Sequence, residues 1–147
     1  EIDDRDLEAL ISEKVRETRE VYRLDMVHVS SGDHTQPTAS VRLISPEGNV
    51  LSDAALGTGP VDAVYKAINR IVQVQNQLTE FSVKSVTEGI DAIGEVTIRI
   101  EADGRSYVGR GGDTDIIVAS AKAYMNALNR LLSTKETHQP VEVETTP

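Results

Sequence analysis

The chain has 147 residues, no cysteine and a net charge of −9 at pH 7. This length suits a single domain, and the missing cysteines exclude a disulfide framework, a thiolate nucleophile and a thiolate metal site. The negative charge, without a basic stripe, argues against nucleic acid as a partner, and no apolar run reaches the roughly 20 residues of a membrane helix. We therefore expect a cytoplasmic protein that binds neither nucleic acid nor a membrane.

The first 23 residues predict an amphipathic helix. Between Asp3 and Tyr22 apolar side chains recur at spacings of three and four residues, and aspartates stand at the start, where the helix dipole favours negative charge. This segment has no counterpart before the second half of the chain. It is therefore expected to be a connector or packing helix, and a chain that begins in this way is expected to be a piece of something longer.

An internal repeat follows this helix. Leu24–Gly32 matches Phe81–Gly89 at an offset of 57 residues, and both segments are typical of strands that end on glycine. Ile44–Gly48 then matches Ile100–Gly104 at an offset of 56, as the turn of a hairpin in each half. Each half is therefore predicted to contain antiparallel strands joined by a tight turn.

The repeat continues into a helix in each half. Ala67–Ile71 matches Ala127–Leu131 at an offset of 60, and both segments contain an Asn-Arg pair inside a helical pattern. The sequence thus predicts an α+β fold of two strand-strand-strand-helix units, residues 24–77 and 78–133, related by pseudo-two-fold symmetry. Residues 134–147 have no periodic pattern and are expected to be a disordered tail.

The third strand of each unit, predicted at residues 50–56 and 106–109, runs into a glycine-rich turn before the helix. These turns are Gly57–Pro60 and Gly109–Thr114. Pro60 suits the first helical position, because its missing N–H would have no partner there. Glycine turns that lead into helices suit an anion such as a carboxylate or phosphate, although they also serve simply to allow a tight turn. Neither turn matches a nucleotide-binding motif.

Aspartates accompany both turns. Asp113 or Thr114 is the predicted N-cap of the second helix, while Asp62, Asp113 and Asp115 are expected to cap or to compensate helix dipoles more readily than to contact a ligand. Together, two anion-friendly turns, carboxylates and apolar strands would suit a zwitterion with an aliphatic side chain. An amino acid fits, with its carboxylate on backbone N–H groups and its ammonium on an aspartate.

No catalytic constellation is visible. His28, His34 and His138 fall in a strand, a loop and the tail, at spacings that suggest no metal site, and no nucleophile–base pair accompanies them. We therefore expect neither catalysis nor a resident metal or cofactor in this chain.

Two long segments resemble a known family. Gly57–Ile71 and Gly111–Arg130 closely resemble, in order, the C-terminal regulatory domain of 2-isopropylmalate synthase, and the related domain of citramalate synthase is the near alternative. The resemblance covers about Leu24 to Leu132. It implies that residues 1–23 end the connecting segment from a missing catalytic TIM barrel, where a divalent metal assists the condensation of acetyl-CoA with 2-oxoisovalerate in leucine biosynthesis.

The resemblance also implies a homodimeric feedback sensor that binds leucine, or isoleucine, near the subunit interface and inhibits the distant barrel. Phe81 stands where family members often have tyrosine. Carried over by position, the effector-binding residues would be Gly59, Pro60, Val61, Asp62, Leu78, Phe81, Ser85, Gly112, Asp113 and Thr114.

Three functions remain open at this stage. The first is a leucine-sensing domain of 2-isopropylmalate synthase, and the second is an isoleucine-sensing domain of citramalate synthase. The third is a dimerisation module without a ligand. A free-standing enzyme ranks below all three, because no nucleophile, base or metal cluster is visible.

Overall fold

The computed structural model describes residues 20–86 and 92–144, with side chains up to residue 135. The predicted N-terminal helix therefore lies outside the described residues as far as residue 19. Val21 and Tyr22 form a bend rather than the end of a helix, and Arg23 already belongs to the first strand.

The first unit has three strands and a helix, as the sequence predicts. Strands β1 (Arg23–Gly32), β2 (Thr35–Ile44) and β3 (Val50–Leu56) form an antiparallel sheet in that order, and helix α2 (Pro60–Val72) follows. Alternate side chains of β2 face the core, because successive residues of a strand point to opposite faces. The fully buried ones are Ala39, Val41 and Leu43.

The second unit repeats this arrangement. Strands β4 (Gln77–Val86), β5 (Ile93–Ala102) and β6 (Arg105–Asp113) form a second antiparallel sheet in that order, and helix α3 (Ile116–Glu144) follows. The central strand β5 again buries alternate side chains, namely Val96, Ile98 and Ile100. The prediction of an α+β fold with two strand-strand-strand-helix units is confirmed.

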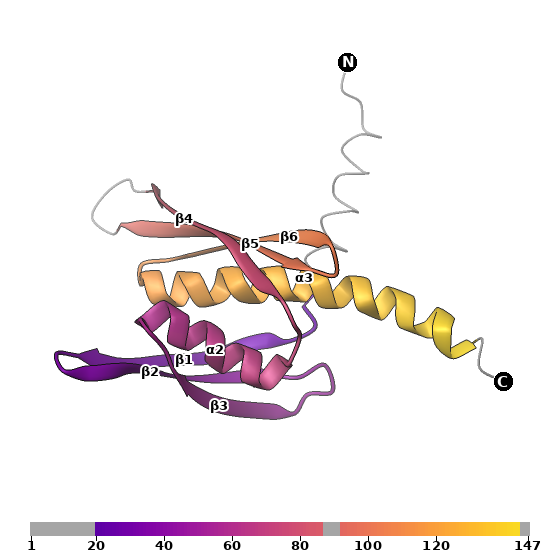
Figure 1. Cartoon of the computed structure of the whole chain (residues 1–147), viewed down its shortest axis with the longest axis horizontal. Coiled ribbons are helices and arrows are strands. Elements are labelled where there is room, and N and C mark those ends of the chain that lie inside the picture. The colour runs from indigo at the N-terminus through magenta and orange to yellow at the C-terminus, as the bar shows by residue number, and fades with distance from the viewer. Residues whose placement is uncertain (1–19, 87–91, 145–147) are drawn as a thin grey trace, which may run out of the picture.

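The two helices lie between the two sheets (Figure 1). Helix α2 packs mainly on β2 and β3, while α3 packs mainly on β6 and β5 and also reaches β1. Both helices begin at the same end of the molecule, and α3 projects beyond the sheets toward the C-terminus (Figure 1). The core is therefore one apolar layer shared by both units, built from valine, isoleucine, leucine and alanine around the buried ring of Tyr124.

The strand pairing corrects the repeat in the first strands. Leu24 pairs with Leu43 and Leu78 pairs with Ile100, and each pairing is followed by a β-bulge at the next residue, Asp25 or Thr79. Leu24 therefore corresponds to Leu78, an offset of 54 residues rather than 57. The sequence match was misleading because strands with alternating apolar residues resemble one another at several shifts, whereas a bulge marks one position.

The second glycine-rich segment is a strand rather than a turn. Gly111 and Gly112 pair with Val96 and Glu95 inside β6, which ends at Asp113 instead of residue 109. A methyl group on Gly109 would lie 2.2 Å from the carbonyl oxygen of Ala123, and one on Gly111 would lie 2.5 Å from that of Ala119. These glycines let α3 approach the sheet closely, which is a packing role.

The C-terminal tail is also different from the prediction. Helix α3 continues through Glu144, so residues 134–144 are helical where a disordered tail was expected, and 145–147 lie outside the described residues. Locally, Lys135, Glu136 and Gln139 favour helix up to Pro140, and the helix passes this proline before it ends at Glu144. A helix needs no apolar periodicity to extend a few turns beyond its domain.

Candidate functional site

The start of α2 is closed by the carboxylate of Asp62. Gly59 is the extended N-cap residue and Pro60 takes the first helical position, as predicted. Asp62 Oδ2 accepts a hydrogen bond from the backbone N–H of Thr58 at 2.9 Å and forms an ion pair with Lys66 Nζ at 3.1 Å. The Thr58 N–H first, and then Lys66, hold the pKa of Asp62 below its ordinary value.

The start of α3 is closed in a similar way. Asp115 Oδ1 accepts from the N–H of Ile117 at 2.8 Å, so Asp115 is the N-cap, and not Asp113 or Thr114 as predicted. The cap lies later because β6 runs on to Asp113. Asp113 instead accepts from the N–H of Asp115 at 2.9 Å and from Lys122 Nζ at 3.1 Å, and these two contacts lower its pKa.

These carboxylates occupy backbone N–H groups at the helix starts, where the sequence analysis expected an anionic ligand to bind. The N–H groups of Thr58, Asp115 and Ile117 already donate to aspartates, and that of Gly57 donates to the carbonyl of Pro37. A ligand carboxylate at either helix start would also meet a negative side chain. Asp115 caps α3, and Asp62 and Asp113 accept from nearby backbone N–H groups, which is the local role that the sequence analysis weighed beside ligand contact.

A groove of about 650 Å³ lies between α2 and the start of β4. Its wall combines apolar side chains with carboxylate, ammonium, guanidinium and amide groups, a mixture suited to a small zwitterion with an aliphatic part. The lining residues are Ala55, Leu56, Asp62, Tyr65, Lys66, Asn69, Arg70, Asn76, Leu78 and Tyr124.

The floor of this groove is an aromatic and amide cluster. The rings of Tyr65 and Tyr124 stack with centroids 4.4 Å apart. Asn69 Nδ2 donates to the Tyr124 hydroxyl at 2.9 Å, this hydroxyl donates to Asn76 Oδ1 at 3.0 Å, and Asn76 Nδ2 donates to Asn69 Oδ1 at 3.3 Å. Burial raises the pKa of Tyr124, so its hydroxyl keeps its proton in this closed ring of hydrogen bonds.

One polar atom of the floor lacks a well-formed hydrogen bond. The Tyr65 hydroxyl is buried and, within the described residues, forms no hydrogen bond of good geometry, although the Ser120 side chain lies close enough to oppose the effect of burial on its pKa. Burial raises its pKa, so the hydroxyl is neutral at physiological pH. A buried polar group without a well-formed hydrogen bond carries a free-energy cost.

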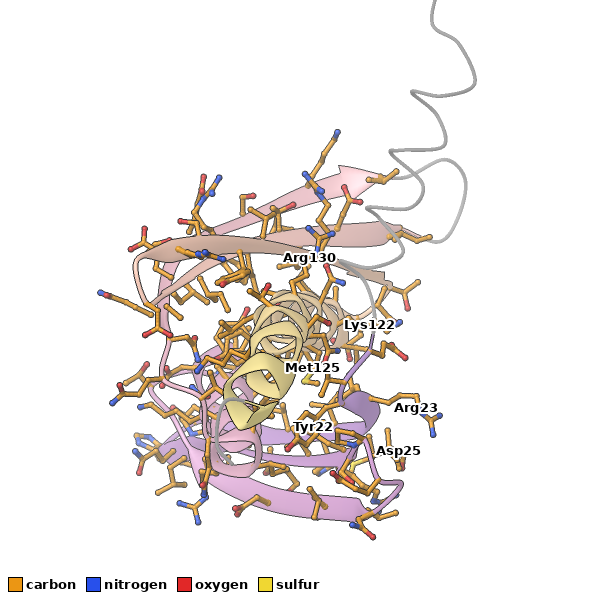
Figure 2. All side chains as sticks on the ribbon, turned by 90° about the vertical axis from the view of Figure 1, so that its right-hand side faces the viewer. Tyr22, Arg23, Asp25, Lys122, Met125 and Arg130 are labelled. Atoms are coloured by element: carbon orange, nitrogen blue, oxygen red, sulfur yellow. The ribbon has the colours of Figure 1, made fainter. Side chains whose placement is uncertain are left out.

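A second groove of about 820 Å³ lies at the pseudo-equivalent place, between α3 and the start of β1. Leu24 and Asn129 line it where Leu78 and Asn69 line the first groove. Figure 2 shows Tyr22 and Arg23 at the start of β1 below Lys122 and Met125 of α3. Its aliphatic lining residues are Leu24 and Met125, against Ala55, Leu56 and Leu78 in the first groove, and we take the first groove as the candidate for an aliphatic ligand.

The structure gathers only part of the predicted effector site. Asp62 and Leu78 line the first groove, whereas Gly112 lines the second. Phe81 and Ser85 lie further along β4, opposite Ile98 and Gly94. The remaining predicted residues lie at the two helix starts without lining either groove: Gly59, Pro60, Val61, Asp113 and Thr114.

Sequence reasoning missed the groove floor. By sequence alone, Tyr65 and Tyr124 fall in the apolar stripes of the two helices, and the repeated Asn-Arg pairs indicate no role for Asn69 or Asn129. Their occurrence in both halves, inside otherwise apolar helices, was the available signal, because a buried amide needs partners.

The inner face of β4 is an open apolar surface continuous with the first groove. Opposite residues of an antiparallel pair share a face, so Leu78, Phe81 and Val83 lie on the same side as the buried Ile100, Ile98 and Val96. The three are 37%, 41% and 51% exposed, respectively. Both helices contact β1, whereas every residue of β4 is exposed.

We expect Asp62 to titrate below the ordinary aspartate pKa of about 3.9. A folded-state pKa below the unfolded one gives stability that is present above about pH 4 and is lost as the pH falls through the lowered pKa. An NMR titration of the carboxyl carbon measures this directly. Lys66→Gln should raise the pKa only in part, because the Thr58 N–H is the larger cause; an ordinary pKa in the unmodified chain would contradict the geometry.

Among residues 20–86 and 92–144, no three histidine, aspartate or glutamate side chains are grouped so that they could hold a metal ion. In the same part of the chain, neither helix combines the length and apolar character needed to cross a membrane.

The repeated units and the shared helix layer define a two-unit α+β domain, and comparison with known proteins identifies its family. The profile of the LeuA allosteric (dimerisation) domain family matches residues 1–132. The chain therefore belongs to this family, as the motifs suggested.

Individual relatives are full-length enzymes. The chain is 63% identical to the 2-isopropylmalate synthase of Crocosphaera subtropica over 131 residues, which cover 89% of this chain and 24% of that protein. It is 61% identical to that of Gloeothece citriformis over 136 residues, 92% of this chain and 25% of that protein. The chain thus spans about a quarter of the length of these curated relatives.

Proposed function

We propose that this chain is the regulatory, dimerising domain of a 2-isopropylmalate synthase and that it binds leucine as a feedback inhibitor. The family description and the names of the relatives support the first part. On this proposal the condensation of acetyl-CoA with 2-oxoisovalerate belongs to a metal-dependent barrel outside this chain. The domain itself has a binding role.

The α2–β4 groove is the observation that carries the leucine proposal. It offers Leu78, Leu56 and Ala55 to an isobutyl side chain. Asp62 can receive the ammonium group, and Lys66 or Arg70 the carboxylate; each of these cations now pairs with an aspartate, Asp62 or Asp53, at 3.1 Å. With Lys66 as the partner of the carboxylate, a ligand that carries both charges can replace the Asp62–Lys66 pair without leaving a charge unpaired.

The open face of β4 supports the dimeric part. It begins at Leu78 in the groove and continues through Phe81 and Val83, so a second copy seated on it would close the outer side of the groove. Exposed apolar patches of this kind commonly mark interfaces. The effector would then contact both copies, and its binding would favour one packing of the dimer over another.

Calorimetric titration of the chain with leucine, isoleucine and valine tests the function. Saturable binding at about one site per subunit, tightest for leucine, supports the proposal, and the mass in solution should be that of a dimer. A preference for isoleucine would move the parent enzyme to citramalate synthase. Failure of all three to bind to an intact dimer would favour a dimerisation module without a ligand.

Leu78→Ala should weaken leucine binding about tenfold, because it removes much of the apolar contact to the ligand side chain. The chain contains its own matched control, since Leu24 holds the equivalent position in the other groove. Leu24→Ala should leave the affinity within about twofold. Equal losses in both variants would mean that leucine does not lie in the α2–β4 groove.

A further inference from the structure

Asn129 holds the peptide segment that leads into the domain. Its side chain is 3% exposed. Asn129 Oδ1 accepts from the backbone N–H groups of Val21 and Tyr22 at 3.0 and 2.9 Å, and Nδ2 donates to the carbonyl oxygen of Tyr22 at 2.9 Å. These contacts join residues more than 100 positions apart, and they satisfy both ends of a buried amide.

The other unit contains the equivalent contact. Asn69, the repeat counterpart of Asn129, binds the side chain of Asn76, which directly precedes β4. Asn76 and Tyr22 differ by 54 positions, the offset that the β-bulges establish for the first strands. The Asn of each Asn-Arg pair therefore holds the segment that leads into a first strand.

The two contacts are crossed between the units. Helix α3 of the second unit holds the segment before β1 of the first unit, and α2 of the first unit holds the segment before β4 of the second. The Asn129 contact is buried and joins distant residues, whereas the Asn69–Asn76 contact is part-buried and joins residues only seven positions apart. If α3 shifts relative to α2, residues 21 and 22 move with α3 unless the Asn129 hydrogen bonds break.

A continuous set of contacts links the first groove to Asn129. Tyr65 and Leu78 line the groove, and Tyr65 stacks on Tyr124 of α3. Tyr124 also closes the hydrogen-bond ring with Asn69 and Asn76, and Asn129 lies five residues further along the same helix. In Figure 2, Tyr22 lies beside the part of α3 that carries Met125. A ligand that contacts Tyr65 therefore acts, through the Tyr65–Tyr124 stack, on α3, the helix that holds residues 21 and 22.

We infer that Asn129 is a positioning residue that passes effector binding from the helix layer to the segment before β1. This inference rests on the proposed function, because it takes the α2–β4 groove as the effector site. The hydrogen bonds of the Asn129 amide make residues 21 and 22 move with α3. The two packings of the dimer therefore differ in the direction from which the chain enters the domain.

Amide hydrogen exchange at Val21 and Tyr22, measured by NMR with and without saturating leucine, tests the inference. In the unmodified chain, leucine should change both exchange rates at least threefold. In Asn129→Ala, both amides should exchange at least about tenfold faster without ligand, because their acceptor is lost. Leucine should still bind within about threefold of the original affinity, but the response at residues 21 and 22 should disappear.

Asn126→Ala is the matched control. Asn126 lies on the same helix and accepts from the N–H of Arg110 in β6 at 3.1 Å, so its loss leaves the N-terminal segment held. A leucine response that persists in Asn129→Ala, or that vanishes equally in Asn126→Ala, would overturn the role of Asn129. Leucine binding without any response in the unmodified chain would overturn transmission alone, whereas no leucine binding would overturn the proposed function with it.

Discussion

Gly109→Ala should lower the free energy of unfolding by about 3 kcal/mol and the melting temperature by ~10 °C. The added methyl group would lie 2.2 Å from the carbonyl oxygen of Ala123 and 2.4 Å from the backbone nitrogen of Ala127. These are main-chain atoms of α3, so no side-chain rotation relieves the overlap. The helix must move away from β6, and the apolar layer that it shares with α2 must open.

Gly112→Ala provides the control for this change within the same strand. A methyl group there would meet only ordinary contacts, at 3.8 Å from the carbonyl oxygen of Gly94 and from the side chain of Ile93. We expect a change of less than about 1 kcal/mol. Thermal and urea unfolding of both variants decide the matter; equal stability of the two would mean that α3 does not lie as close to β6 as the glycines indicate.

Val83→Asp should weaken dimerisation at least about 100-fold. Val83 is the most exposed of the three apolar side chains on the inner face of β4. If a second copy covers that face, the substitution buries a carboxylate without a partner, and an uncompensated buried charge costs about 3–5 kcal/mol. Light scattering and sedimentation equilibrium over a range of concentrations would detect the monomer.

Ser82→Asp is the matched control for the dimer. Ser82 is exposed on the same strand, but it points to the opposite face, where it pairs with Thr97. The same negative charge placed there should leave the dissociation constant within about threefold. If Ser82→Asp dissociates the dimer and Val83→Asp does not, the outer face of the sheet is the interface.

Gly109 and Val83 lie in differently covered parts of the second sheet. Gly109 lies where the helix of one unit meets its own sheet, and Val83 lies where β4 is left uncovered. Helix α2 has 13 residues and α3 has 29. The longer helix reaches across to β1 of the other sheet, whereas the shorter one leaves all of β4 exposed. The repeat is therefore symmetric in topology and asymmetric in coverage.

Local features were predictable because contiguous residues encode them. Asp103-Gly104 predicts a two-residue hairpin turn, and both residues adopt the positive φ that such a turn requires, 54° and 75°. Pro60 starts α2 at the first helical position. Alternating apolar residues predicted β2 and β5, and the matched Asn-Arg segments predicted a helix in each unit. Their order along the chain was enough to predict the fold class.

Features that join distant residues were not predictable in this way. The sequence could not show that Gly111 belongs to a strand. A glycine is needed there because the main chain of Ala119, on helix α3, lies too close for a side chain. The sequence placed the N-cap of α3 too early for the same reason. The proposed groove depends on Tyr65, Leu78 and Tyr124, which three separate elements bring together.

The sequence by itself determined two strand-strand-strand-helix units, the turns between their second and third strands and the apolar faces of their strands and helices, since these depend on periodicity and on turn residues within a few positions. Only the tertiary structure decided the 54-residue register of the first strands, the crossed asparagines and the uncovered face of β4. Asn129 and Val21 are 108 positions apart. A hydrogen bond at that separation leaves no local pattern, because it exists only after both units have packed on one shared layer of helices.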